Sequence, residues 1–175
     1  MAWKKTKSGS RPKIYSVNIK GEKIYKLKEW KKNNPGKIYF DSDFERKSYL
    51  LLEAAGFNFE FQPTARELIP PLKSFALSKG KPIKLFRSSV RPLSYTMDFV
   101  VHCDNGTDIF LETKGYFTPE SRIRFKLFQH SLEKNEMCLL IKQGAYKTPM
   151  ENVKAVIKII NENFMNHEPK KLLRI

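Results

Sequence analysis

The chain has 175 residues, of which 41% are hydrophobic and 29% are charged, and this composition suits a compact globular protein with a hydrophobic core. No apolar run approaches the roughly 20 residues that span a bilayer, and the first residues lack the apolar stretch of a signal peptide. We therefore expect a cytoplasmic protein with no membrane partner. The 33 Lys and Arg exceed the 18 Asp and Glu and give a net charge of +15, which predicts binding to a polyanion, most often nucleic acid.

The N-terminal residues carry much of this charge. Residues 1–37 contain 12 Lys or Arg and 2 Glu. Residues 14–27 hold two β-rich runs around Lys20–Lys23 and predict a hairpin, whereas residues 28–37, "KEWKKNNPGK", predict a basic linker. We place a boundary near Lys37, between a basic arm (1–37) and a core (38–175). The alternative is that the arm only increases solubility.

The first part of the core predicts a helix, a strand and a long insert. Residues 41–56, "DSDFERKSYLLLEAAG", have capping residues at the start and Gly56 at the end, as a helix does. Residues 57–62, "FNFEFQ", alternate strictly and predict a strand. Residues 63–94 contain five prolines, and seven Lys or Arg against one Glu. We expect a basic, Pro-rich insert there, with one short strand at 83–87.

The second part of the core predicts a hairpin, two helices and a strand. The runs 93–103 and 107–117 flank Asp104-Asn105-Gly106, and Asn-Gly favours a tight turn. Thr118 and Pro119 open a helix, and Thr148 and Pro149 open another, where Glu151 completes a capping box. Between them, "MCLLIK" is typical of a strand that is buried on both faces. This order predicts an α/β fold, a mixed sheet flanked by helices.

The hairpin carries the residues that are hardest to explain as structural. Alternation places Asp98 on the face opposite Met97, Phe99 and Val101, and strand pairing brings it to Glu112 and Lys114. Two carboxylates suit Mg²⁺ or Mn²⁺. Such an ion activates water for attack on a phosphate, and a lysine stabilises the charge that develops. The alternative is an exposed ion pair of little energetic value.

These residues resemble a known nuclease signature. Asp98 followed by Glu112-Thr113-Lys114 is similar to the PD-(D/E)XK motif, with Met97 where proline is usual. The strings "FDSDFERKSYLLLEAAGFNFEFQP", "SYTMDF" and "FLETKGYFTPESRIRFKLFQ" follow the order of phage endonuclease I-type Holliday-junction resolvases. The similarity runs from about Phe40 to Ile141. It implies a restriction-endonuclease-like core.

The resemblance also implies a site and an assembly. Its catalytic residues are Glu45, Asp98, Glu112 and Lys114, and its metal ligands are Glu45, Asp98, Glu112 and the backbone carbonyl of Thr113. It implies two Mg²⁺ or Mn²⁺ ions per site, branched DNA as substrate, and a homodimer that exchanges segments, in the host cytoplasm if the protein is phage-encoded. Without the resemblance, Glu45 is a solvated helix carboxylate.

Basic residues outside the arm are candidates for DNA contacts. They are Arg87, Arg91, Arg122, Arg124 and Lys126, and each either grips phosphates or belongs to a solvated face. Two other functions remain open. One is a PD-(D/E)XK nuclease that cuts linear or nicked duplex, and the other is a basic nucleic-acid-binding protein without catalysis.

Overall fold

The computed structural model describes residues 15–77, 85–115, 118–142 and 149–165, with the backbone alone over 72–90 and at 149. The chain divides into two compact units, Met1–Arg46 and Lys47–Ile175. The division falls inside helix α2 (Asp43–Ala55). The boundary that the sequence placed near Lys37 lies within the first unit. Among the described residues, no helix is long and apolar enough to cross a membrane.

The first unit contains a small antiparallel sheet and one short helix. The sheet order is β2-β1-β3, from β1 (Ser16–Asn18), β2 (Lys23–Ile24) and β3 (Tyr39–Phe40). The hairpin predicted around Lys20–Lys23 is confirmed, and Gly21 takes a φ of +86° at its turn. Val17, Ile24 and Phe40 are buried, so the sheet has a small apolar core.

The basic linker predicted at 28–37 is wrong, because Leu27–Asn33 form helix α1. Glu29 lies in its first turn, and Lys31 and Lys32 lie in its last turn, which complements the helix dipole. The ring of Trp30 meets the ring of Tyr39 edge-on, with 6.3 Å between centroids. The sequence pattern did not predict this helix, because Trp30 is its only aromatic residue and most residues around it are lysines.

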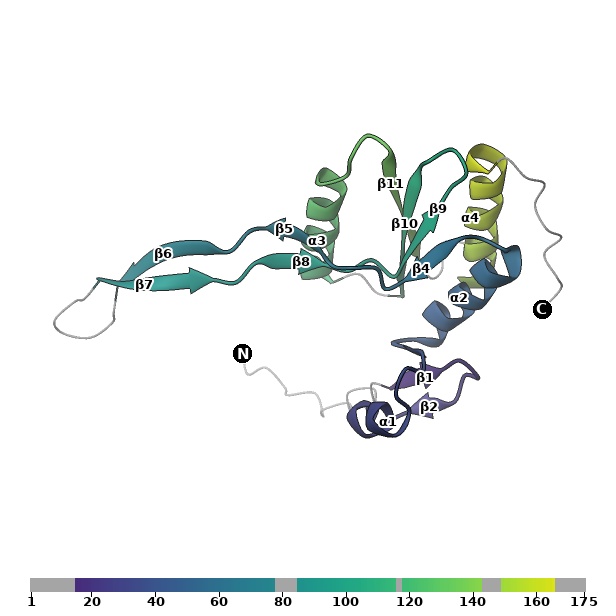
Figure 1. Ribbon diagram of the computed structural model, residues 1–175, viewed down its shortest axis with the longest axis horizontal. Helices are drawn as coiled ribbons and strands as arrows, with labels where there is room; N and C mark the ends of the chain where they lie inside the picture. The colour runs from purple at the N-terminus through teal and green to yellow at the C-terminus, as the bar shows by residue number, and fades with distance from the viewer. Residues whose placement is uncertain (1–14, 78–84, 116–117, 143–148, 166–175) are drawn as a thin grey trace, which may run out of the picture. The chain divides into compact units, whose positions relative to one another are not determined.

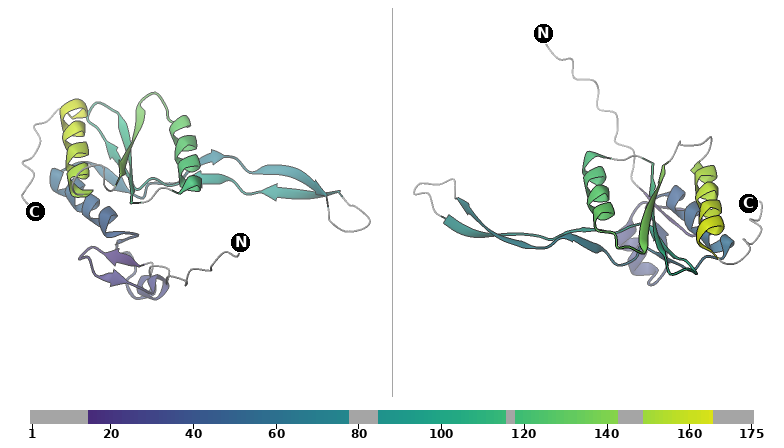
Figure 2. Two further views of the ribbon diagram at one scale, coloured as in Figure 1. Left: turned by 180° about the vertical axis from the view of Figure 1, so that it is seen from behind. Right: turned by 90° about the horizontal axis from the view of Figure 1, so that it is seen from above.

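The second unit is built on a four-stranded mixed sheet with helices on both faces (Figures 1 and 2). The sheet order is β11-β10-β9-β4, from β4 (Phe59–Phe61), β9 (Phe99–His102), β10 (Asp108–Lys114) and β11 (Glu136–Lys142). Helix α3 (Pro119–His130) covers one face, and α4 (Pro149–Phe164) covers the other. The predicted α/β class is confirmed. Thr118 caps α3 as expected, since its hydroxyl accepts from the Ser121 N–H at 3.1 Å.

Strand β11 differs from the expectation of a strand buried on both faces. Among the described strands it pairs only with β10, in parallel, and lies at the edge of the sheet. Ile141 is its one buried residue, and Glu136–Leu140 are half-buried. A run of apolar residues fits an edge strand as well as a central one, so the sequence pattern could not distinguish them.

The insert is a two-stranded antiparallel ribbon, and the strand expected at 83–87 overlaps one of its strands, although residues 83 and 84 lie outside the described residues. Its inner part pairs β5 (Arg66–Ile69) with β8 (Leu93–Tyr95), and its outer part pairs β6 (Leu72–Leu77) with β7 (Leu85–Val90). Figure 1 shows the two parts following one another. Pro70, Pro71 and Pro92 lie between the parts, where a residue without an N–H interrupts the hydrogen-bond ladder.

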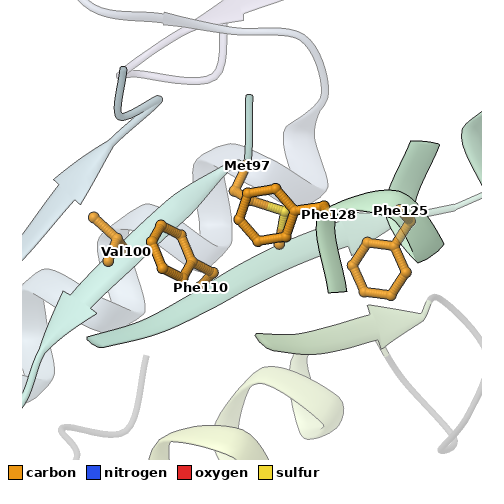
Figure 3. Packing of buried hydrophobic residues seen from close by; sticks show 5 residues of the cluster. All are labelled: Met97, Val100, Phe110, Phe125 and Phe128. Atoms are coloured by element: carbon orange, nitrogen blue, oxygen red, sulfur yellow. The ribbon is translucent and has the colours of Figure 1, made fainter. Parts of the chain in front are cut away.

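The main core on the α3 side packs aromatic residues between helix and sheet. Met97, Val100, Phe110, Phe125 and Phe128 form this cluster (Figure 3). Alternation had placed Met97 with Phe99 and Val101, which is wrong. Residues 96–98 are not part of a strand, so the period of two fails there and Met97 packs with Val100.

Candidate active site on the β9–β10 hairpin

The tight hairpin between β9 and β10 sets the geometry of the candidate site. Gly106 takes a φ of +79° at the turn, and its N–H donates to the Cys103 carbonyl at 3.0 Å. The antiparallel register pairs Leu111 with Phe99. Just before β9, the Asp98 carboxylate accepts hydrogen bonds from Thr113 and lies near Glu112. The predicted hairpin is confirmed, and it brings the Asp98 and Glu112 carboxylates together.

Thr113 fixes the Asp98 carboxylate. Asp98 Oδ2 accepts the Thr113 backbone N–H at 2.7 Å and the Thr113 hydroxyl at 2.6 Å. Sequence reasoning assigned Thr113 only a carbonyl ligand and missed this role. Two hydrogen bonds to one oxygen hold the carboxylate in a single orientation, as a metal ligand or catalytic base requires.

Glu112 is an acidic group held inside the sheet face. Its side chain is 1% exposed, and its Oε1 accepts the Tyr95 hydroxyl at 2.8 Å and forms an ion pair with Lys114 Nζ. Burial, and then the nearby charge of Asp98, raise the pKa of Glu112 to about 7, although Lys114 and Tyr95 oppose the rise. The exposed ion pair considered from the sequence is therefore wrong, because the carboxylate is buried.

The second oxygen of this carboxylate is the unusual atom of the site. Among the described residues, Glu112 Oε2 is buried and has no hydrogen-bond partner. A buried acceptor left without a partner costs about 1–3 kcal/mol. A bound cation would remove that cost, and oxygen atoms of carboxylates are the ligands that Mg²⁺ and Mn²⁺ prefer.

Tyr95 is a site residue that sequence reasoning did not select. Burial, together with the charge of Glu112, raises the pKa of Tyr95, so the phenol stays protonated and donates its hydrogen bond. Its ring also packs against Phe128, with 6.0 Å between centroids. Tyr95 lies three residues before Asp98, and this spacing was the available sign of a role at the site. Because residues 96–98 are irregular, strand alternation does not predict which face of the sheet Tyr95 occupies.

Glu45 belongs to the first unit, where it helps to start helix α2. Its backbone N–H donates to the Ser42 hydroxyl at 3.0 Å, and its Oε2 accepts the Asp41 N–H at 2.6 Å. The side chain is 4% exposed, so the alternative of a solvated carboxylate is wrong. The contacts resemble a capping box, and the catalytic role of Glu45 stays a prediction.

The structure describes the candidate DNA contacts to different extents. Arg87 lies in β7, where only the backbone is described, and Arg91 is exposed just after that strand. On α3, Arg122 and Lys126 are exposed one turn apart. Arg124 pairs with Glu120 at 2.6 Å, and its charge acts on Tyr95 and lowers the pKa of that hydroxyl against the dominant effects. Arg124 therefore lies near the Tyr95 hydroxyl that contacts Glu112.

Two carboxylates of the hairpin, Asp98 and Glu112, lie near one another. No group of three or more His, Cys, Asp or Glu that could hold a metal ion occurs within the ranges 15–77, 85–115, 118–142 and 149–165. The two carboxylates with the Thr113 carbonyl make an all-oxygen donor set. With the unpartnered Glu112 Oε2, this set fits one hard divalent cation.

Comparison with known proteins gives a family and no activity. Neither the curated proteins nor the solved structures contain a match to the chain. A protein family does match residues 24–148, from strand β2 through the hairpin, helix α3 and strand β11. Because this match covers most of the 175 residues, the chain belongs to the family described as "Protein of unknown function (DUF1064)".

Proposed function

We propose that this protein is a divalent-metal-dependent endonuclease that hydrolyses DNA phosphodiesters on a restriction-endonuclease-like core. The observation that carries the proposal is Glu112, buried beside Asp98 and Lys114 with one oxygen that lacks a partner among the described residues. Burying a carboxylate is costly unless it is paired or binds a cation, and the contacts with Lys114 and Tyr95 engage only Oε1. The net charge of +15 supplies the attraction for DNA.

The residues of the chain divide the work of the site. Asp98, held by Thr113, and Glu112, through Oε2, would hold Mg²⁺ or Mn²⁺, with the Thr113 carbonyl as a third ligand. A bound ion would supply Lewis acidity toward the phosphate and a lower pKa for its bound water. Tyr95 and Lys114 both contact Glu112 Oε1 and so leave Oε2 for the cation. Lys114 would also stabilise negative charge as the phosphodiester is attacked.

We propose branched DNA as the preferred substrate, on the basis of the resemblance to the endonuclease I-type resolvases. That resemblance adds Glu45 as a further ligand, a second ion and a homodimer that exchanges segments. The basic residues of α3 and the ribbon support DNA binding around the site. The ribbon is the main departure from the resemblance, so cleavage of linear or nicked duplex remains the competing function.

The test compares cleavage of a four-way junction, a nicked duplex, a linear duplex and a single strand. Each is incubated with Mg²⁺, Mn²⁺, Ca²⁺ or EDTA. We expect cutting of the junction first, no cutting in EDTA, and binding with little cutting in Ca²⁺, whose looser coordination positions water poorly. Equal rates on linear duplex would replace the resolvase with a general nuclease.

Matched variants test which residues take part in cleavage. Asp98→Asn and Glu112→Gln should lower cleavage by at least about a hundredfold, the scale on which such electrostatic groups act, and should leave DNA affinity within a few fold. Asp104→Asn is the control, because it removes one exposed carboxylate at the turn of the same hairpin. Robust cleavage by Asp98→Asn in Mg²⁺ would remove the site assignment. If wild type binds DNA but cleaves it under none of these conditions, the alternative function of a non-catalytic nucleic-acid-binding protein would be favoured.

A further inference from the structure

A cavity beside the candidate active site has no role in the proposed hydrolysis. It measures about 210 Å³ and lies against the face of the sheet that α3 covers. Its apolar lining comes from the core cluster of Figure 3, namely Met97, Val100, Phe110 and Phe128. The size and the aromatic lining suit one flat ring system.

Part of the cavity lining is acidic. There the His102 ring lies between two carboxylates, with Nδ1 at 2.8 Å from Asp108 and Nε2 at 3.4 Å from Glu60. All three residues line the cavity. Two carboxylates against one imidazole disfavour phosphate and favour a ligand that offers hydrogen-bond donors.

The Arg66 guanidinium is another polar group of the cavity lining. Arg66 lies 5.0 Å from the ring centroids of both Phe110 and Phe128. Its nitrogens bind both Glu136 oxygens, at 2.7 and 2.5 Å. Because this carboxylate neutralises Arg66, the guanidinium is a poor site for an anion.

Tyr95 joins this cavity to the catalytic carboxylates. Its ring lines the cavity, and its hydroxyl donates to Glu112. Asp108 and Glu112 lie four residues apart on β10, about 14 Å along the strand. A nucleic acid that has its backbone at Glu112 therefore has its bases within reach of the cavity.

We propose that the cavity receives an unpaired nucleobase that carries an exocyclic amino group, with the ring against the aromatic lining and the amino group donating to Glu60 or Asp108. Carboxylates accept hydrogen bonds from such groups, as they do from the amino group of cytosine. The inference rests on the proposed function, because the base belongs to the DNA held at Glu112. Taking up a base costs least where it is already unpaired, so this cavity would select branched or bulged DNA over continuous duplex.

Free nucleosides test the cavity without any cleavage. The full chain is titrated with deoxyadenosine and with purine deoxyriboside, which differs only in lacking the 6-amino group, and binding is followed by NMR shifts. We expect shifts at His102 and Phe110, with purine deoxyriboside roughly tenfold weaker. The double change Glu60→Gln and Asp108→Asn should remove this difference, and Glu67→Gln, a change of charge at an exposed residue that does not line the cavity, should keep it. Equal binding of both nucleosides, or shifts that spare the cavity, would overturn the proposal.

Bulged DNA tests the same cavity in the proposed function. Asp98→Asn protein is titrated with duplexes that carry one unpaired adenine, thymine or abasic nucleotide. We expect adenine to bind several-fold more tightly than the other two. If nucleosides bind at the cavity but wild type does not cleave DNA, the proposed nuclease activity is refuted and the proposed base-binding role of the cavity stands. If wild type cleaves DNA but the identity of the bulged nucleotide has no effect on affinity, the base-binding role of the cavity is refuted and the nuclease activity stands.

Discussion

Burial of the Glu112 carboxylate lowers the free energy of unfolding, and the same carboxylate would be needed to hold a metal ion. Its folded pKa is about 7 against an ordinary value of 4.5, so the folded protein binds the proton more tightly than the unfolded chain. Stability therefore falls as the pH rises from about 4.5 to about 7 and stays lowered above that range. The shift corresponds to a cost on the order of 3 kcal/mol at pH 8.

Removing this charge should stabilise the metal-free protein. We expect Glu112→Gln to unfold at a higher temperature than wild type at pH 8 in EDTA, and the difference to disappear near pH 5, where the wild-type carboxylate is protonated. Thermal unfolding followed by circular dichroism measures both. Asp104→Asn should show neither effect. A variant less stable than wild type at pH 8 would mean that Glu112 serves the fold.

Metal binding should reverse this cost in the wild type. Because a cation binds the ionised carboxylate, Mg²⁺ must displace a proton from Glu112 near neutral pH, and its apparent affinity should rise from pH 6 to pH 8. We expect millimolar Mg²⁺ to raise the unfolding temperature of wild type at pH 8, less so at pH 6, and not to raise that of Glu112→Gln. Equal effects of Mg²⁺ on both proteins would place the ion elsewhere.

At the scale of elements, the hairpin was predictable and the ribbon was not. Asn105-Gly106 between two alternating runs specifies a tight turn, and the turn fixes the register that brings Asp98 to Glu112. In the insert, Pro70, Pro71 and Pro92 separate the strands of the inner part from those of the outer part, so no continuous alternation remains for a sequence pattern to detect. Tyr95 was not predicted for a related reason. Residues 96–98 interrupt the strand, so the side chains before and after them do not follow one continuous alternation.

The outer ribbon should bind DNA without serving the core. Residues 72–90 contain five Lys or Arg and no Asp or Glu, and β6 and β7 pair only with each other within the described sheets. Replacing 72–90 by a short Gly-Ser turn should leave the unfolding temperature nearly unchanged. Affinity for DNA of any sequence should fall, and the slope of log affinity against log salt should become shallower, since fewer counterions are released.

The matched control for that deletion keeps the ribbon and removes its charge. Changing Lys73, Lys79, Lys81, Lys84 and Arg87 to glutamine should reproduce most of the loss in affinity and the shallower salt slope. If the charge variant binds like wild type while the deletion does not, the ribbon contributes through its shape or through another protein chain. If both bind like wild type, the ribbon is not part of the DNA interface.

For the whole molecule, the chain that supplies Glu45 to the predicted site bears on assembly. Glu45 belongs to Met1–Arg46, whereas Asp98, Glu112 and Lys114 belong to Lys47–Ile175. A four-way junction has near two-fold symmetry, and a C2 homodimer offers two sites at a fixed separation. The resemblance to segment-exchanging resolvases leads us to propose that Glu45 completes the site of the partner subunit.

Mixing two inactive proteins tests this proposal. Glu45→Ala and Asp98→Ala proteins are partially unfolded together, refolded, and assayed for nicking of a four-way junction in Mg²⁺, beside each variant refolded alone. If Glu45 acts in the partner's site, each heterodimer has one site with both lesions and one intact site, so nicking returns. If Glu45 acts within its own chain, every site in the heterodimer carries one lesion and activity stays absent. Mixing Asp98→Ala with Glu112→Ala is the control, because both lesions lie on one hairpin, and every heterodimer site then lacks one of the two carboxylates whichever chain supplies Glu45. A chain that sediments as a monomer with junction DNA bound would contradict the dimer, since a monomer has no partner subunit to complete its site.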